Sequence, residues 1–193
     1  MIRLSAIVPA TGGPATLDEC LGAIRRARAA PDELVIADEP ANPGPAAARN
    51  AGAERAKGDM LVFVDADVLV HEDAFERIRR AFEDDPELTA VFGSYDDTPR
   101  APGVVSGFRN LLHHHVHQGS PGPATTFWAG LGAIRRDAFL AAGGFDADRF
   151  ERPAVEDIEL DPGLLGTHLK GWTLASMLSP TWSIAARPGS RRC

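Results

Sequence analysis

The stretch 58–75, GDMLVFVDADVLVHEDAF, gives the clearest indication of the fold of the chain. Its apolar run, 60–64, stops abruptly at two carboxylates one residue apart, Asp65 and Asp67. A short apolar run that ends in turn-forming residues is typical of a strand buried inside a sheet. Apolar residues then recur at helical spacing over 73–82. The stretch therefore predicts a buried strand that ends in two acids and is followed by a helix.

The same order of strand, loop and helix continues on both sides of this stretch. Further strands are predicted where short apolar runs end in polar or turn-forming residues, at 4–9, 33–37 and 89–93. A helix is predicted over 16–29, because Thr16 and Glu19 have the spacing of a capping box. Another is predicted over 45–56, which begins with a proline suited to a first helical turn. This alternation predicts an α/β fold in which helices cover both faces of a mostly parallel central sheet.

Three of the predicted strands end in residues that suit a ligand site. Ligands of open parallel sheets bind beyond the carboxyl ends of the strands. Pro9, Asp38 and Asp65 lie at such ends, so three loops converge on one crevice and two of them carry acids. Carboxylates there suit Mg²⁺ or Mn²⁺, which can bridge a diphosphate. The alternative, a strand-end turn with a helix N-cap, stays open because Asp favours both.

The second half of the chain has a different pattern. A helix is predicted over 104–117, and the stretch 124–146 predicts a strand, a short helix and a Gly-Gly stop. His113 and His117 share a face of the first helix, which leaves a metal site, an acceptor contact and a plain helix surface open. No clear linker or repeat separates the two halves, so one continuous domain is predicted over 1–193.

Composition and charge exclude several classes of protein. The chain has 193 residues and a formal net charge of −7, which argues against general nucleic-acid binding. Its two cysteines show no disulfide framework and indicate a reducing compartment. The N-terminus indicates a core strand rather than a signal peptide, and no stretch reaches the ~18 apolar residues that span a bilayer. These features predict a cytoplasmic protein.

The ordered motifs of the chain resemble those of the family 2 glycosyltransferases, the large inverting group with the GT-A fold. The matching pieces are SAIVPATGGPATLDECL, LVIADE, PAAARNAGAERAKGDMLVFVDADV, FWAGLGAIRRDAFLAAGGFD, VEDIEL and THLKGWTL. The resemblance implies a hexosyltransferase that uses a UDP- or GDP-linked sugar, a glycan, lipid or small-molecule acceptor, and Mn²⁺ or Mg²⁺. It implies that residues 1–100 bind the donor and residues 101–180 the acceptor, with 181–193 as a C-terminal tail.

The resemblance also implies a role for each matching residue. The residues that would bind the donor nucleotide sugar are Pro9, Ala10, Asp38, Arg49, Asp65 and Gly130. The residues that would hold the metal ion are Asp67 and His168. Asp157 matches the general base of the family, with Glu156 beside it. The residues that would contact the acceptor are Trp128, His117 and Trp172.

The segment after the acidic pair departs from the family pattern. The family commonly has Gln-x-x-Arg-Trp where this chain has HLKGW over 168–172, and only eleven residues separate Asp157 from His168. A surface position for His168 and simple packing for Trp172 therefore stay open, as does a missing segment that leaves the acceptor site incomplete. The close spacing motivates an alternative function, a non-catalytic nucleotide-sugar or glycan-binding module.

Two further possibilities follow from the resemblance. A sugar nucleotidylyltransferase has a similar α/β layout, but it needs a basic residue in the loop after the first strand. The loop PATGGPAT, 9–16, contains neither Arg nor Lys. Many relatives act at membranes on lipid or polysaccharide acceptors, so peripheral association with the inner face of a membrane is also left open.

Overall fold

The chain folds around β3 (Met60–Val64), whose five residues are all buried, as the unbroken apolar run predicts. The computed structural model describes residues 1–38, 44–94, 96, 108, 111–112, 115, 123–124, 127–147, 174–176 and 185–186. The predicted strands before β3 form with the predicted bounds, as β1 (Leu4–Pro9) and β2 (Glu33–Ala37). The strand predicted at 89–93 is the shorter β5 (Ala90–Phe92).

Within the described residues the main sheet has seven strands, in the order β2-β1-β3-β7-β5-β8-β6. The strands not yet introduced are β6 (Pro123–Ala124), β7 (Leu131–Arg135) and β8 (Leu174–Ser176). β1 pairs in parallel with β2 and β3, whereas β7 runs antiparallel between β3 and β5. β8 is parallel to β5, and β6 is antiparallel to β8. The prediction of a mostly parallel sheet is therefore confirmed.

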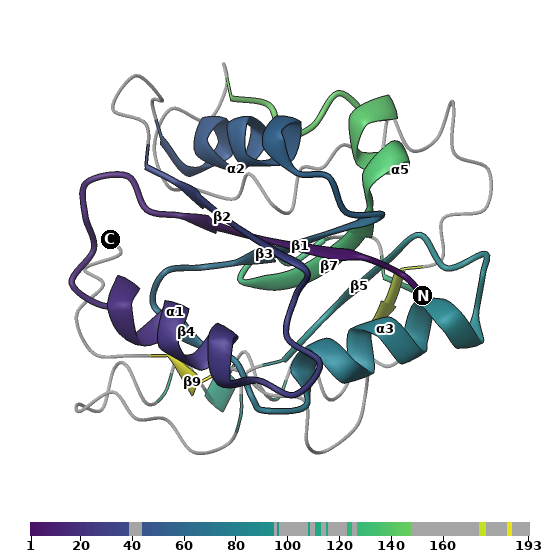
Figure 1. Cartoon of the computed structure of the whole chain (residues 1–193), viewed down its shortest axis with the longest axis horizontal. Coiled ribbons are helices and arrows are strands. Elements are labelled where there is room, and N and C mark those ends of the chain that lie inside the picture. The colour runs from purple at the N-terminus through teal and green to yellow at the C-terminus, as the bar shows by residue number, and fades with distance from the viewer. Residues whose placement is uncertain are drawn as a thin grey trace.

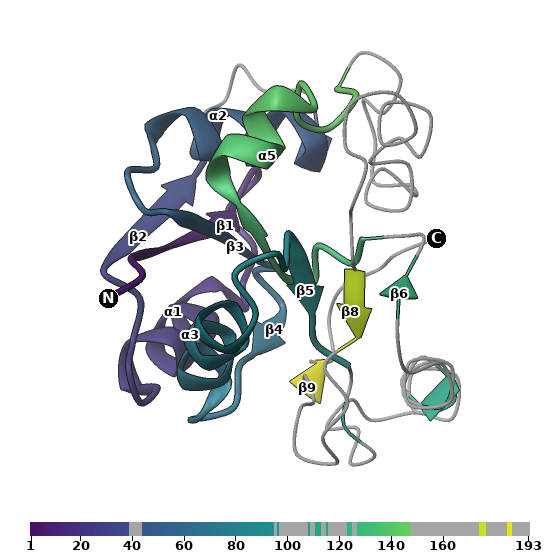
Figure 2. The same cartoon turned by 90° about the vertical axis from the view of Figure 1, so that its right-hand side faces the viewer.

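Helices cover both faces of this sheet (Figures 1 and 2). α1 (Leu17–Arg26) and α3 (Ala74–Asp84) lie on one face. α2 (Gly44–Arg55) and α5 (Arg136–Ala141) lie on the other. A separate two-stranded sheet pairs β4 (Val68–Leu69) with β9 (Ala185–Ala186). In the described ranges, no helix has the length and apolar character that crossing a membrane requires.

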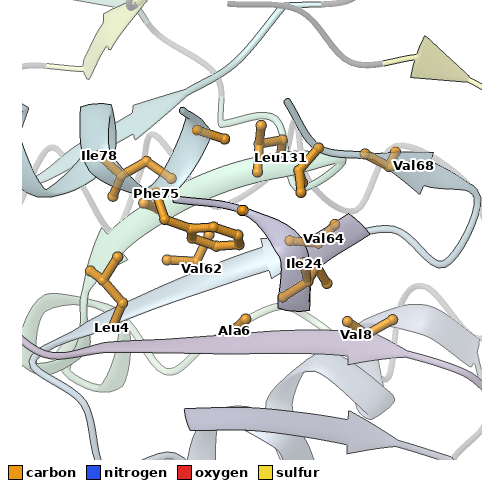
Figure 3. Close-up of a cluster of buried hydrophobic side chains, with 14 of the residues drawn as sticks. Leu4, Ala6, Val8, Ile24, Val62, Val64, Val68, Phe75, Ile78 and Leu131 are labelled. Atoms are coloured by element: carbon orange, nitrogen blue, oxygen red, sulfur yellow. The ribbon is translucent and has the colours of Figure 1, made fainter. Parts of the chain in front are cut away.

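The side chains of β3 alternate between two cores, as the period of a strand requires. Met60, Val62 and Val64 join the core beneath α1 and α3, together with Phe75 (Figure 3). Leu61 and Phe63 join the core beneath α2 and α5. Both faces of β3 are therefore shielded from water. Its carboxyl end leads directly into the loop that carries Asp65 and Asp67.

The helix predicted over 16–29 differs from α1 at both ends. Thr16 has the helical dihedrals φ −86° and ψ −10° and makes no side-chain capping hydrogen bond, so the predicted capping box is wrong. An N-cap residue normally takes an extended conformation, which presents its hydroxyl to the first turn. The helix stops at Arg26 because Ala27 is extended and Ala29 has a positive φ of 49°.

The helix predicted over 104–117 lies largely outside the described residues. Its described members, Phe108, Leu111, Leu112 and His115, are helical.

Candidate functional site

The carboxyl ends of β2, β1 and β3 meet at one edge of the sheet. Pro9 at the end of β1 pairs with Ala37 at the end of β2, and the Ala10 amide donates to the Ala37 carbonyl at 2.9 Å. Asp38 follows directly and is exposed, whereas Ala10 is buried. Asp65 follows β3 on the far side of β1. The structure therefore brings the strand-end residues to one edge, as the parallel order predicts.

Residues 65–68 form a tight turn, here named the Asp65–Asp67 turn. The Val68 amide donates to the Asp65 carbonyl at 2.9 Å, which closes the turn. The Asp65 amide donates to the Gly130 carbonyl at 3.1 Å, which fastens the turn to the chain entering β7. Neither acid caps a helix, because α3 begins at Ala74. The helix N-cap is therefore excluded for these acids, but the strand-end turn of the alternative interpretation is present and carries both carboxylates at the edge of the sheet.

A buried ion pair holds the side chain of Asp65. Arg49 Nη2 donates to Asp65 Oδ1 at 2.7 Å, and the two side chains are only 3% and 11% exposed. The Arg49 guanidinium also lies 5.6 Å from the ring centroid of Phe145. Gly52 lets α2, the helix that carries Arg49, pack close to β1, because a Cβ at this position would lie 2.5 Å from Ile7 Cγ2. The ion pair therefore links Arg49 to Asp65 at the carboxyl edge of the sheet.

The residue after Arg49 makes a second link that the motif assignments did not include. Asn50 Nδ2 donates to the Phe145 carbonyl at 2.8 Å, and the Phe145 amide donates back to Asn50 Oδ1 at 2.9 Å. Gly143 and Gly144, with φ of 83° and 75°, turn the chain so that this bracket can form. The available signal was an Arg-Asn pair inside an otherwise small-residue helix, which needs a polar partner once buried.

Cys20 of α1 lies against the Asp65–Asp67 turn from the other face of the sheet. Its thiol donates to the Asp65 carbonyl, with Sγ 3.5 Å from the oxygen. Burial, with the negative charges of Asp65 and Asp67, raises the pKa of the Cys20 thiol to about 12. The thiol therefore stays protonated and serves as a donor rather than a nucleophile.

Trp128 and two glycines, Gly130 and Gly132, form a wall beside the turn, in the chain that leads into β7. A Cβ on Gly130 would lie 2.5 Å from Trp128 Nε1, so the half-buried indole covers this glycine closely. A Cβ on Gly132 would lie 2.4 Å from the Trp128 carbonyl oxygen and 2.5 Å from Phe127 Cζ. Only glycine fits at either position without displacing its neighbours. Trp128 and Gly130 therefore lie together, next to the amide of Asp65.

Five of the predicted site residues lie outside the described residues. They are His117, Glu156, Asp157, His168 and Trp172. Among the residues that the structure describes, no three His, Cys, Asp or Glu side chains gather as a metal-binding group. The donor set still suits Mg²⁺ or Mn²⁺, since these ions take few protein carboxylates and complete their shell with water and phosphate oxygens. The ion pair with Arg49 engages Oδ1 of Asp65, and Asp67 lies half-buried on the same turn.

The parallel strands with acids at their carboxyl edge place the chain among the Rossmann-like α/β proteins. Similarity to known proteins identifies the family. The sequence model of glycosyl transferase family 2 matches residues 38–141, more than half of the chain. The chain therefore belongs to glycosyl transferase family 2. An uncharacterised glycosyltransferase of Haemophilus influenzae is 28% identical over 114 residues, which cover 53% of this chain and 35% of the relative. The chain thus spans about a third of that relative's length.

Solved structures confirm the GT-A fold. A mannosyltransferase of Pyrobaculum calidifontis, PcManGT, in complex with GDP-Man and Mn²⁺, matches with a TM-score of 0.69 at 19% identity. The match covers 98% of this chain and 58% of that protein. TarS of S. aureus in complex with UDP-GlcNAc matches with a TM-score of 0.68 at 14% identity, covering 99% of this chain and 60% of TarS. GalNAc-T7 with UDP, GalNAc and Mn²⁺ matches at 0.66 and 14% identity, covering 97% and 44%.

Proposed function

We propose that this chain catalyses the inverting transfer of a hexosyl group from a nucleoside diphosphate sugar to an acceptor hydroxyl, with a divalent metal. The observation that carries the proposal is the buried Arg49–Asp65 pair at the carboxyl edge of the sheet. Removing two charges from water is costly, so a buried ion pair is weak support for stability alone. A requirement to hold one carboxylate in a single position at a ligand site explains the pair better.

In this proposal the donor nucleotide lies along the edge formed by β2, β1 and β3. Asp38 is exposed there and suits a contact with the nucleobase, while Pro9 and Ala10 form the floor. Asp65, oriented by Arg49, accepts from ribose hydroxyls. Gly130, whose backbone is closely covered by the Trp128 indole, is proposed to lie near the donor sugar. Three structural neighbours were solved with GDP-Man, UDP-GlcNAc or UDP, which supports a nucleotide-linked donor.

Asp67 is the described residue proposed to hold the metal, with His168 as the second candidate from the sequence. A bound Mn²⁺ or Mg²⁺ would offset the charge of the departing diphosphate. Two structural neighbours were solved with Mn²⁺, which supports a divalent ion. Asp67 itself contributes a carboxylate on a turn whose backbone is fixed at both Val68 and Gly130.

The chemical step needs one base. Asp157, with Glu156 beside it, is proposed to take the proton from the acceptor hydroxyl. The acceptor oxygen then bonds to the anomeric carbon from one face as the bond to the diphosphate oxygen breaks on the other. The configuration inverts, the carboxylate keeps the proton, and the nucleoside diphosphate leaves with the bonding electrons. No covalent intermediate on the protein is required.

A turnover assay with matched variants tests this proposal. Wild type is incubated with Mn²⁺ and a panel of UDP- and GDP-linked sugars, and release of the nucleoside diphosphate is measured with candidate acceptors. Asp157→Asn should lower turnover by at least about a hundredfold while leaving donor binding intact. Asp67→Asn should lose both. Donor binding without turnover in wild type would instead support the non-catalytic module with an incomplete acceptor site.

A further inference from the structure

The side chain of Arg49 must be held in place by residues outside its own helix. It is long, and only 3% of it is exposed. The other buried residues of α2 are Ala46, Ala48, Gly52 and Ala53. Their side chains are too small to fix the rotamer of a neighbour with several rotatable bonds. The direction in which the guanidinium points is therefore set by residues of other elements.

Phe145, which follows Gly143 and Gly144, lies where it can orient Arg49. The guanidinium lies over the Phe145 ring, 5.6 Å from its centroid, within the range of a cation–π contact. Such contacts are strongest where water is excluded, and Phe145 is only 2% exposed. The same guanidinium donates from Nη2 to Asp65 Oδ1 at 2.7 Å. The ring and the carboxylate therefore hold one guanidinium between them.

Phe145 is itself fixed through both its ring and its backbone. Its ring packs edge-on against Phe63 and Phe139, with centroids 5.2 Å apart in both pairs. Asn50 bonds to the amide and the carbonyl of its backbone, at 2.9 and 2.8 Å. Phe63 belongs to β3, the strand that ends next to Asp65. The strand that carries the acid thus also supports the ring on which the partner of that acid rests.

We propose that Phe145 is a positioning residue of the donor site, which holds the Arg49 guanidinium where it orients the Asp65 carboxylate. Because its ring is buried, Phe145 acts through Arg49 rather than by contact with the donor. The inference rests on the proposed function, which gives Asp65 its role at the nucleotide sugar. The alternative is that Phe145 only fills the core, as its neighbour Phe139 does.

A matched pair of variants, Phe145→Leu and Phe139→Leu, separates these two roles. Both side chains are almost fully buried, and both rings lie 5.2 Å from the Phe63 ring. Each substitution removes one ring from the same cluster, so both should lower Tm by a similar amount. Calorimetric titration of UDP and GDP with Mn²⁺ measures the nucleotide affinity. Phe145→Leu should bind about tenfold more weakly than wild type, whereas Phe139→Leu should bind like wild type.

A second measurement needs no nucleotide. Side-chain NMR follows the exchange of the Arg49 guanidinium protons with water. They should exchange slowly in wild type and in Phe139→Leu, because the guanidinium is buried and bonded to Asp65. In Phe145→Leu they should exchange about tenfold faster, since one of the two groups that hold the guanidinium is gone. Asn50→Ala should have a smaller effect in the same direction, because it releases the backbone of Phe145.

Three results would overturn the proposal. They are unchanged exchange of the Arg49 protons in Phe145→Leu, unchanged nucleotide affinity of that variant, and an equal loss of affinity in Phe139→Leu. Wild type that binds neither nucleotide would overturn the proposed function instead, and with it the donor role of Phe145. The exchange rates would still decide whether Phe145 orders Arg49, so the two failures are distinguishable.

Discussion

The helices on the two faces of the sheet contribute different kinds of side chain to the interior. Beneath α1 and α3 the core is composed of interlocking aliphatic and aromatic side chains, with Phe75, Ile78 and Phe82 supplied by α3. Beneath α2 the helix contributes mainly alanines, and it carries Arg49 into the interior. The first helix pair is held by apolar burial. The second face combines a close helix approach with a buried ion pair that ends at the Asp65–Asp67 turn.

The difference separates stability from positioning. On the α1 and α3 face, every large buried side chain contributes through the apolar area that it removes from water. On the α2 face, Arg49 and Asn50 are polar, and each is bonded to a residue at a strand or turn end. Substitutions of the large apolar side chains of α3 should therefore change the free energy of unfolding alone, whereas substitution of Arg49 should also change ligand binding.

The largest expected effect comes from Arg49→Met. It leaves the Asp65 carboxylate buried without its 2.7 Å partner and should lower the free energy of unfolding by about 3–5 kcal/mol. Phe75→Ala on the other face should cost a similar ~3–5 kcal/mol. Urea denaturation gives both values, and calorimetry gives nucleotide affinity of the folded protein. Only Arg49→Met should lose affinity; an equal loss in Phe75→Ala would erase the distinction between the faces.

A double variant sharpens this result. Adding Asp65→Asn to Arg49→Met removes the unpaired charge, so part of the lost stability should return. Nucleotide affinity should not return, because the carboxylate itself is missing. Recovery of both would show that the pair serves stability only.

Next in size is the effect of breaking the Asn50 bracket. Asn50→Ala removes both hydrogen bonds to the Phe145 backbone and leaves its amide and carbonyl without these partners, at a cost of about 1–3 kcal/mol. Asn50→Asp keeps an acceptor for the Phe145 amide. It should cost less than Asn50→Ala at a pH where the new carboxyl group is protonated, because it can then also donate to the Phe145 carbonyl. The unfolding free energies of the two variants provide the measurement. Equal values for Asn50→Ala and wild type would refute the bracket.

The sequence predicted the fold better than it predicted this network. The limits of β1, β2 and β3 follow directly from apolar runs, because burial is encoded locally by residue type. The roles of Asn50 and Cys20 depend on Phe145 and Asp65, which are 95 and 45 residues away. No local pattern encodes such contacts. The failed cap at Thr16 has the opposite cause: the correct residue types were present, but the backbone adopted a helical conformation there.

Substitution of Gly130, which lies against Trp128, should also destabilise the protein, by a comparable amount. Gly130→Ala would place a Cβ 2.5 Å from Trp128 Nε1 and should cost about 1–3 kcal/mol by overpacking. Trp128→Leu in the same protein should return part of this cost, because the clashing indole is gone. Unfolding free energies of the single and double variants test this coupling. Additive costs would mean that the two residues do not share the contact.

The smallest effect concerns a surface carboxylate far from the site. Burial acts to raise the pKa of Asp32, but hydrogen bonds from the Leu4 amide and Arg79, with the charge of Arg79, outweigh it and hold the pKa below 3.8. A depressed pKa stabilises the fold above the unfolded-state pKa, and the contribution disappears as pH falls through the folded-state pKa. Asp32→Asn should therefore lower the free energy of unfolding near pH 7 by well under about 1 kcal/mol. The lower stability should appear as a slightly lower Tm. The difference from wild type should shrink as pH falls through the folded-state pKa; a difference that does not change with pH would contradict this prediction.

The central claim is that the Asp65–Asp67 turn binds a nucleoside diphosphate through a metal. The most direct test is calorimetric titration of UDP and GDP, with Mn²⁺ or with EDTA, into wild type, Asp67→Asn and Asp59→Asn. Asp59 lies just before the other end of β3, where its carboxylate accepts from the Arg3 amide, so it is a matched control. We predict Mn²⁺-dependent binding of one nucleotide to wild type and Asp59→Asn, and none to Asp67→Asn. Binding that persists in Asp67→Asn, or that ignores Mn²⁺, would contradict the claim.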